Sequence, residues 1–299
     1  METTTIEELN ARFGITGRLS FEHGPGGFVF ARLESRGGTA EVCLHGAHVT
    51  AFAPKEQPPV IWVSPDAVFA PTKAIRGGIP VCWPWFADHP NDPDKPAHGV
   101  ARTTQWEVTA SSMIAPEAIR IEFTLPSEIA GPVAPGIELK LEVTLTNALE
   151  LELTTTNHSE ESFSLSEALH TYLQIGAIEK ISIDGLDNTL YLDKLEAYLE
   201  KRQEGDVIVN SQTDRIYQDT SADILVHDGE LQRIIRVGKT GSSTTVVWNP
   251  WAAVAEKMAD FTDDGFQHMV CVEATNAVKD IIVLEPGDHH ILGTRIAIE

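Results

Sequence analysis

Charged and aromatic side chains gather in one irregular segment of the sequence, residues 71–102. Arg76 and Arg102 stand near its two ends, and a guanidinium presents a planar fork of donors that matches phosphate oxygens. Trp85 and the aromatic residues beside it offer flat apolar faces of the kind on which sugar rings stack. Because a long irregular loop inside a compact domain is usually functional, we expect this segment to line a binding site.

Two titratable residues stand in strand-like sequence outside this segment. Glu273 follows three apolar residues, so we expect its backbone to be buried at the end of a strand. A carboxylate in such a place is costly unless it has a task or a partner. His170 precedes Thr-Tyr-Leu in a similar context. On the residues alone, a salt-bridged carboxylate and a hydrogen-bonded core histidine are open alternatives to catalytic roles.

Alternating apolar and polar residues predict the elements that hold these groups. A period of two is typical of half-buried strands, and it is clearest in residues 138–145 and 149–153. A turn near Asn147 separates these two segments, which predicts a hairpin. Further strands are predicted at 40–44, 48–53, 119–125, 205–210, 223–227, 231–237, 244–248, 268–273, 280–284 and 291–298.

Helical signals are scarce by comparison. The segment Thr4–Glu7 resembles a capping box and predicts a short helix over 5–12, and another turn or two is predicted within 252–261. Many short strands with almost no helical crossovers predict an all-β fold, a large antiparallel β-sandwich. The strands are evenly spread and no linker separates them, so we expect a single domain over residues 1–299.

Composition and charge narrow the class of protein. The 299 residues carry a net charge of −22, which repels nucleic acid and anionic membranes and argues against both as partners. No stretch approaches the roughly 20 apolar residues of a membrane span. The opening residues 1–8 lack the basic and apolar regions of a secretory signal, so we expect a cytoplasmic protein. The three cysteines are widely spaced among apolar neighbours, which predicts buried reduced thiols.

Several segments, taken in order, carry a family signature. They are Arg76–Pro80, Trp83–Phe86, His98–Arg102, Ser166–Leu173, Trp248–Trp251, Met258–Phe261 and Val270–Glu273. In these segments the chain resembles the hexose-6-phosphate mutarotases, which are glucose-6-phosphate 1-epimerases of the aldose 1-epimerase superfamily. The matches extend from about residue 40 to the end of the chain. The resemblance implies a twisted supersandwich of two large antiparallel sheets, in agreement with the strand prediction.

The resemblance also implies a reaction. The α and β anomers of a hexose 6-phosphate, with glucose 6-phosphate first, would be interconverted by opening and closing the ring at C1. An acid must protonate the ring oxygen while a base removes the proton of the C1 hydroxyl, and no cofactor is required. The resemblance places the acid at His170 and the base at Glu273. An imidazole and a carboxylate, with ordinary pKa values of about 6.5 and about 4.3, suit these roles near neutral pH.

Further residues are expected to hold the substrate. By resemblance, His98 holds the sugar near its ring oxygen, and Arg76 and Arg102 bind the substrate and its phosphate. Asp193 resembles the family's substrate-binding aspartate and could accept hydrogen bonds from sugar hydroxyls. Trp85 is a candidate platform for the sugar ring, with a plain loop-core aromatic as the alternative. Ala97 stands where some relatives carry Gln, which removes one polar contact from the predicted phosphate site.

Two other functions are open alternatives. A mutarotase of neutral aldoses would have no need for the two arginines, and a non-catalytic carbohydrate-binding domain would have no need for both an acid and a base. Metal binding is not expected, because the histidine pairs 45/48 and 289/290 lack the spacing of a zinc site and adjacent residues on a strand point to opposite faces. The expected partner is a small-molecule sugar phosphate, and a sandwich of this size can work as a monomer.

Overall fold

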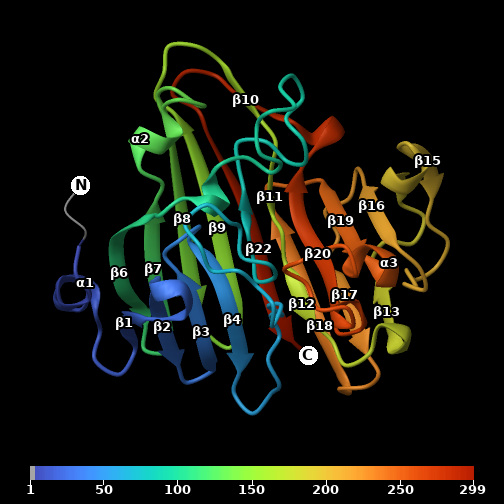
Figure 1. The fold of residues 1–299 in the computed structure, drawn as a ribbon, viewed down its shortest axis with the longest axis horizontal. Coiled ribbons are helices and arrows are strands. Elements are labelled where there is room, and N and C mark those ends of the chain that lie inside the picture. Colours follow the sequence, from blue (N-terminus) through green and yellow to red (C-terminus); the bar gives the residue numbers. More distant parts are fainter. Residues whose placement is uncertain (1–3) are drawn as a thin grey trace.

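Antiparallel β-sheets make up most of the structure, a computed structural model that describes residues 4–299 (Figure 1). One eight-stranded sheet extends across the whole molecule. Its strands, in spatial order, are β13 (Ile181–Asp184), β17 (Ile224–Asp228), β18 (Arg233–Thr240), β22 (His289–Ile298), β9 (Leu149–Asn157), β8 (Ile137–Leu145), β7 (Ala118–Thr124) and β6 (Glu107–Ala115).

Two further sheets face this one. The first has the order β1 (Leu19–His23), β2 (Val29–Ser35), β3 (Gly38–Cys43) and β4 (His48–Pro54). The second has the order β15 (Leu199–Arg202), β14 (Leu190–Asp193), β16 (Thr213–Tyr217), β19 (Thr244–Asn249), β20 (Met269–Asn276), β11 (Glu167–Leu169) and β5 (Val81–Cys82), and β12 (Tyr172–Gln174) also pairs with β20. A small sheet joins β10 (Phe163–Leu165) to β21 (Ile282–Leu284).

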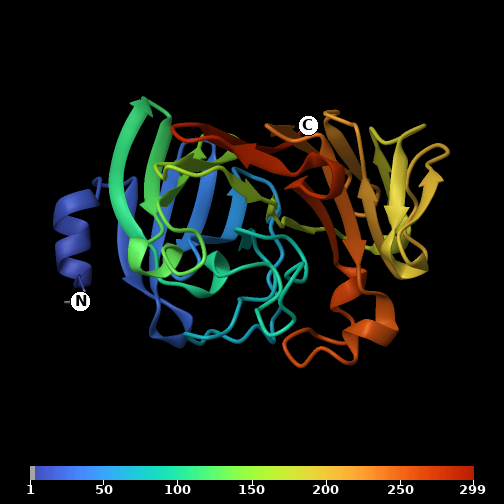
Figure 2. The ribbon, with the colours of Figure 1, turned by 90° about the horizontal axis from the view of Figure 1, so that it is seen from above.

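The sheets pack as two layers around a shared core. Strands β7 and β8 pack against β2 and β3, while β18 and β22 pack against β20 (Figure 2). Along β8 the side chains of Leu139, Leu141 and Val143 point into this core and are fully buried, as the alternation predicted. The prediction of a large antiparallel sandwich is therefore confirmed. Burying apolar area of this kind is the main source of stability of the fold.

Helices contribute little. They are α1 (Ile6–Phe13), α2 (Ser127–Ala130) and α3 (Trp251–Ala255), with 3₁₀ turns η1 (Pro25–Gly27), η2 (Ala101–Thr103), η3 (Ile178–Lys180), η4 (Lys194–Glu196), η5 (Gly265–Gln267) and η6 (Val278–Asp280). Within residues 4–299 no helix is long and apolar enough to cross a membrane. The irregular segment 71–102 and the region around α3 extend from the same side of the sandwich, away from β22 (Figure 2).

The structure confirms some of the predicted elements and corrects others. The hairpin is formed by β8 and β9. The predicted strand at 205–210 is wrong, because only an isolated bridge joins Val207 to Ile183 there. The N-terminal helix begins one residue later than predicted, since Thr5 is the N-cap and forms the capping box with Glu8. Residues 1–3, part of the segment considered for a secretory signal, lie outside the described residues.

Candidate active site

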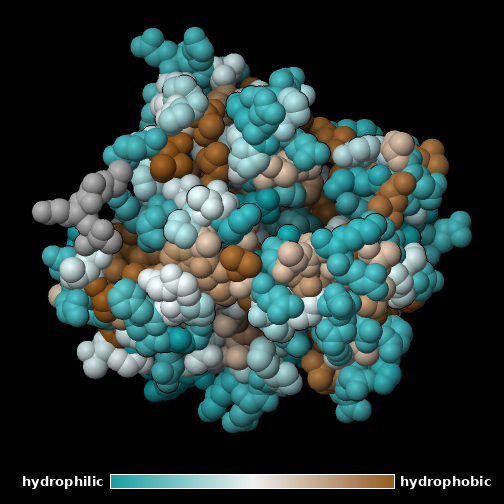
Figure 3. Space-filling view, in the orientation of Figure 1, coloured by the Kyte–Doolittle hydropathy of each residue, from teal (hydrophilic) through white to brown (hydrophobic). Residues whose placement is uncertain are grey.

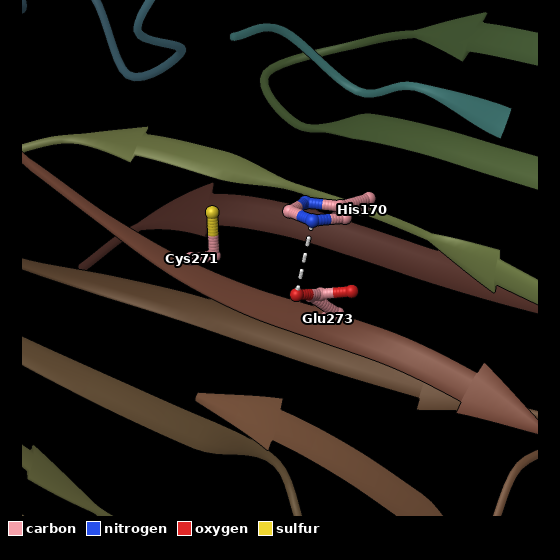
Figure 4. A group of neighbouring side chains, drawn as sticks. All are labelled: His170, Cys271 and Glu273. Carbon is pink, nitrogen blue, oxygen red and sulfur yellow. Dashed lines mark ion pairs between the residues drawn. The ribbon is translucent and has the colours of Figure 1, made fainter. Parts of the chain in front are cut away.

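His170 and Glu273 lie opposite one another on paired strands. Strands β11 and β12 pair with β20 on either side of a two-residue break, and both keep the same register, which places His170 directly across from Glu273. Residues paired in this way share one face of the sheet. The Nε2 atom of His170 is 3.5 Å from the Oε1 atom of Glu273 (Figure 4). Glu273 therefore lies within strand β20, whereas the sequence had suggested a position at the end of a strand.

Burial determines the protonation of this pair. The side chain of Glu273 is 1% exposed and that of His170 is 11% exposed. Burial raises the pKa of Glu273 well above its ordinary value, and burial together with the charges of His98, Arg102 and Arg76 lowers the pKa of His170 well below its own. Both shifts favour the neutral forms of the two groups over the ion pair, and one proton can pass between carboxyl and imidazole across this contact.

Aromatic and sulfur-containing side chains line the same face. The ring of His170 stacks on that of Tyr172, with centroids 4.9 Å apart, and meets Trp248 edge-on at 6.1 Å. Cys271 is opposite Tyr172 in the register and points to the same side as Glu273 (Figure 4). The space-filling view shows a hollow near the middle of this face, over the region of β11 and β20 in Figure 1 (Figure 3).

The ligand atoms of His170, Cys271 and Glu273 lie within 4.8 Å of one another, close enough to share a metal ion (Figure 4). A metal would require the anionic forms of the thiol and the carboxyl. Burial raises the pKa of Cys271 well above its ordinary value, and Glu273 is shifted in the same direction. All three cysteines are buried and free, as predicted. Without a bound cation the thiol and the carboxyl therefore favour their neutral forms.

Arg76 is held beside this pair by two contacts. Its Nε donates to Asp260 Oδ1 at 3.2 Å, and its Nη1 donates to the hydroxyl of Tyr172 at 3.3 Å. Because the ring of Tyr172 stacks on that of His170, one aromatic ring connects the guanidinium to the imidazole. The loop behind Arg76 is anchored where Nε2 of His48 meets the carbonyl oxygen of Gly77 at 2.8 Å. A histidine that the sequence left without a role thus fixes the arginine loop.

His98 faces His170 from the irregular segment. The two rings meet edge-to-face, with centroids 5.7 Å apart. The backbone N–H of Ala87 donates to Nδ1 of His98 at 3.3 Å. Burial, followed by the charges of Arg102, Lys194 and Arg76, lowers the pKa of His98 to about 3. His98 is therefore a neutral imidazole whose proton is on Nε2, and it can donate one hydrogen bond.

A glycine allows His98 to approach so closely. Gly99 has a φ of +73°, and a Cβ atom added there would lie 1.9 Å from the carbonyl oxygen of Trp83. That oxygen accepts hydrogen bonds from the backbone of Val100 and Ala101. Gly99 lies two residues before η2, the turn that contains Arg102. Nη2 of Arg102 donates to the carbonyl oxygen of Ala97 at 2.8 Å, and no carboxylate within residues 4–299 pairs with this guanidinium.

Two predicted site residues lie apart from His170 and Glu273. Trp85 is 6% exposed; its Nε1 donates to Pro96 and its ring meets the edge of His89, so most of its surface is covered within the loop. Asp193 accepts hydrogen bonds from Lys201 Nζ at 2.9 Å and from the backbone N–H of Leu195 at 3.1 Å. The structure brings together the other five predicted residues, which are Arg76, His98, Arg102, His170 and Glu273.

Three residues of this face were not predicted as site residues. Trp248 meets His170 edge-on, and Asp214 is opposite Trp248 in the register between β16 and β19. Lys194 forms an ion pair with Asp214, with Nζ and Oδ2 2.8 Å apart. Trp248 opens one of the segments that carry the family signature, and Lys194 directly follows Asp193, so both stood beside residues already singled out.

Known proteins with similar sequences carry related names. The sequence model of the family described as "Aldose 1-epimerase" matches residues 31–297. A relative from Cenchrus ciliaris, named "Putative glucose-6-phosphate 1-epimerase", is 35% identical over 260 residues, which cover 83% of this chain and 78% of the relative. A relative from Escherichia coli strain K12 with the same name is 34% identical over 254 residues, and 84% of each chain is covered.

Solved structures share the fold. A Salmonella typhimurium structure titled "putative mutarotase (YeaD)" superposes with a TM-score of 0.88 at 27% identity, and 98% of each chain is covered. The galactose 1-epimerase of Lactobacillus acidophilus NCFM has a TM-score of 0.71 at 15% identity and covers 94% of this chain and 98% of its own. At that identity the second likeness establishes the fold alone.

Proposed function

The chain belongs to the aldose 1-epimerase family and is an isomerase of that kind, and we propose that its substrate is a hexose 6-phosphate, glucose 6-phosphate first. The reaction exchanges the α and β anomers. The bond between C1 and the ring oxygen breaks, the C1 hydroxyl loses a proton and becomes the aldehyde, and the ring oxygen gains a proton. Rotation about the C1–C2 bond and closure on the other face complete the exchange with no net change in atoms or electrons.

One proton shared by two buried groups is sufficient for this reaction. Glu273, as base, takes the proton of the C1 hydroxyl while His170, as acid, gives one to the ring oxygen. The pair thereby passes from an ion pair to its neutral form, and closure reverses the transfer. Burial favours the neutral form, which is the state of the pair when the ring is open. The two groups titrate together, so their apparent pKa values belong to the pair.

His98 supplies a second contact to the sugar. Its Nδ1 accepts from Ala87, so its Nε2–H is free to donate to the ring oxygen or a neighbouring hydroxyl. A neutral donor stabilises negative charge that develops on that oxygen without competing as an acid. The edge-to-face contact with His170 supports a common target for the two imidazoles.

The two arginines are the basis for a phosphorylated substrate. In a chain with a net charge of −22, a phosphate requires a local concentration of cations. Arg76 and Arg102 both act on the pKa values of His170 and His98, which supports a shared site for their charges. Arg102 donates to one backbone carbonyl oxygen and forms no ion pair within residues 4–299, so its fork can receive phosphate oxygens. Arg76 is partly engaged by Asp260.

The setting of the reaction is part of the proposal. We propose a single domain that acts as a monomer on a free sugar phosphate in the cytoplasm. The strongly acidic composition supports the absence of nucleic-acid and membrane partners.

The observation that carries the proposal is the opposed pair His170 and Glu273 within reach of two arginines. Saturation-transfer NMR measures the exchange of the two anomers of glucose 6-phosphate and, separately, of free glucose with the protein added. Faster exchange of the phosphate ester alone is expected. Acceleration of free glucose alone would remove the phosphate from the proposal, and no acceleration of either sugar would overturn the enzymatic function.

A further inference from the structure

Lys194 occupies the edge of the candidate site that the sequence assigned to Asp193. Asp193 is paired with Arg215 in the register between β14 and β16, and Arg215 is paired with Val247. Val247 is opposite Val272, whose side chain points into the core. Since paired residues share a face, the side chain of Asp193 belongs to the face opposite that of Glu273.

Asp193 instead fixes the turn that follows it. Its carboxylate accepts from the backbone N–H of Leu195 and from Lys201 Nζ, and it is the N-cap of η4. The first residue of that turn is Lys194. A capped turn holds its backbone in one conformation, so the direction of the Lys194 side chain is set by the aspartate before it.

The ammonium group of Lys194 lies on the catalytic face. It pairs with Asp214 at 2.8 Å, and Asp214, Trp248 and Cys271 are joined by the register across β16, β19 and β20. The side chains of Lys194 and Asp214 are 23% and 15% exposed, so the pair is largely shielded from water but remains reachable. The charge of Lys194 acts on both Glu273 and His98, which places the ammonium near the base and the neutral donor together.

The order of the strands defines which part of a sugar would meet this ammonium. Glu273 on β20 has His170 on one side, toward β11, and Asp214 on the other side, toward β16. Carbon C1 has two ring neighbours, the ring oxygen and C2. If His170 serves the ring oxygen and Glu273 serves the C1 hydroxyl, the remaining direction leads to C2 and its hydroxyl group.

We propose that Lys194, braced by Asp214, binds the C2 hydroxyl of the hexose and so selects sugars that carry it. The inference rests on the proposed function. An ammonium that is already oriented by a carboxylate has further donors available, since it carries three. A hydrogen bond from a charged donor is worth roughly a 10- to 100-fold difference in affinity or rate. A sugar phosphate without that hydroxyl would leave Lys194 without its substrate partner.

The test compares glucose 6-phosphate with 2-deoxyglucose 6-phosphate, for the wild type and for Lys194→Met. Anomer exchange gives kcat/KM for each sugar. The wild type should prefer glucose 6-phosphate by about 10- to 100-fold, and Lys194→Met should lose that factor for glucose 6-phosphate while 2-deoxyglucose 6-phosphate is little affected. Lys180→Met is the matched control, because Lys180 pairs with the exposed Glu230 far along the chain and should leave the preference unchanged.

Removing Lys194 alone leaves the carboxylate of Asp214 without its partner, which can destabilise the fold. The double variant Lys194→Met/Asp214→Asn removes that charge, and the same loss of preference is expected. An unchanged preference in these variants would overturn the role of Lys194 while the proposed function stands. A wild type that exchanges neither sugar phosphate would overturn the proposed function itself, and the inference with it.

Discussion

The imidazole of His170 and the carboxyl of Glu273 are cross-strand partners whose nearest nitrogen and oxygen atoms are 3.5 Å apart. About one hundred residues of sequence separate them, and only the sheet brings them together. His170 lies in the two-residue break between β11 and β12, and the register with β20 is the same on both sides of that break. The opposed arrangement of these two side chains is thus a property of the sheet.

Substitution of Arg102 tests the predicted phosphate site. Arg102→Met should raise KM for glucose 6-phosphate by about 10- to 100-fold, because a phosphate would lose a charged hydrogen-bond donor. The effect on free glucose should be small, since that sugar has no phosphate. Exchange rates measured by NMR over a range of both sugars provide the comparison.

Arg295→Met is the control for this substitution. Arg295 on β22 pairs with Glu150 on β9 at 2.9 Å, in a different sheet from Glu273, so its loss should change neither KM. Equal losses with both sugars in Arg102→Met would contradict a phosphate contact and indicate a general role of the loop.

The buried carboxyl of Glu167 should give the free energy of unfolding an unusual dependence on pH. Its side chain is fully buried and its contact with His290 is 3.7 Å. Burial raises the pKa of Glu167 to about 8 and lowers the pKa of His290, so the contact joins two neutral groups near neutral pH. A raised pKa means that the folded state binds this proton more tightly than the unfolded state. The stabilisation is complete at acid pH, below the ordinary pKa of a carboxyl, and is lost as the pH rises toward 8.

Glu167→Gln should remove that loss. The amide keeps the shape and stays neutral, so the free energy of unfolding of the variant should exceed that of the wild type increasingly as the pH rises. The difference can grow by up to about 1.4 kcal/mol per pH unit. Urea unfolding at several pH values between 5 and 8 measures it, with the exposed Glu150→Gln as the control. Parallel curves for Glu167→Gln and the wild type would refute the shifted pKa.

Adding a side chain at Gly99 should lower both the stability and the activity of the protein. Gly99→Ala places a Cβ atom 1.9 Å from the carbonyl oxygen of Trp83, so the backbone that carries His98 must move. Gly27 is a matched control, since its φ of +74° is nearly the same and nothing lies within 4 Å of an added Cβ.

Gly27→Ala should lower the free energy of unfolding by only about 1 kcal/mol, the strain of the left-handed conformation. Gly99→Ala should lower it further and also reduce the rate of anomer exchange. Urea unfolding and exchange measured on the same samples distinguish the two effects. If both variants lost the same free energy of unfolding and kept the same exchange rate, the close approach of Gly99 to Trp83 would not matter for activity.

Much of the fold could be predicted because apolar and polar residues alternate clearly along the long strands. In β8 apolar and polar residues alternate through all nine positions, and in β9 they alternate from Leu149 to Leu153, so the hairpin follows from them. The strands from β10 to β16 have three to five residues, too few for a period of two to stand out from irregular sequence. Conversely, residues 205–210 alternate but form only one bridge, between Val207 and Ile183.

The candidate site was predicted residue by residue, and its limits have a physical cause. Sequence resemblance pointed to Asp193, which pairs with Lys201, whereas the side chain that pairs with Asp214 is that of Lys194, one position later. A shift of one residue reverses the face of a strand, and only the register between β14 and β16 reveals it. Trp248 was likewise visible as a motif but not as a neighbour of His170, since that contact joins distant strands.

A double-mutant cycle on the catalytic pair tests the central claim most directly. The rate of anomer exchange of glucose 6-phosphate is measured for the wild type, His170→Gln, Glu273→Gln and the double variant, with sugar binding followed by calorimetry. If the two groups share one proton and act as a unit, each single variant loses about 100- to 10,000-fold in rate while it still binds, and the double variant is no slower than either. Losses that multiply in the double variant, or single variants that retain the wild-type rate, would contradict the account.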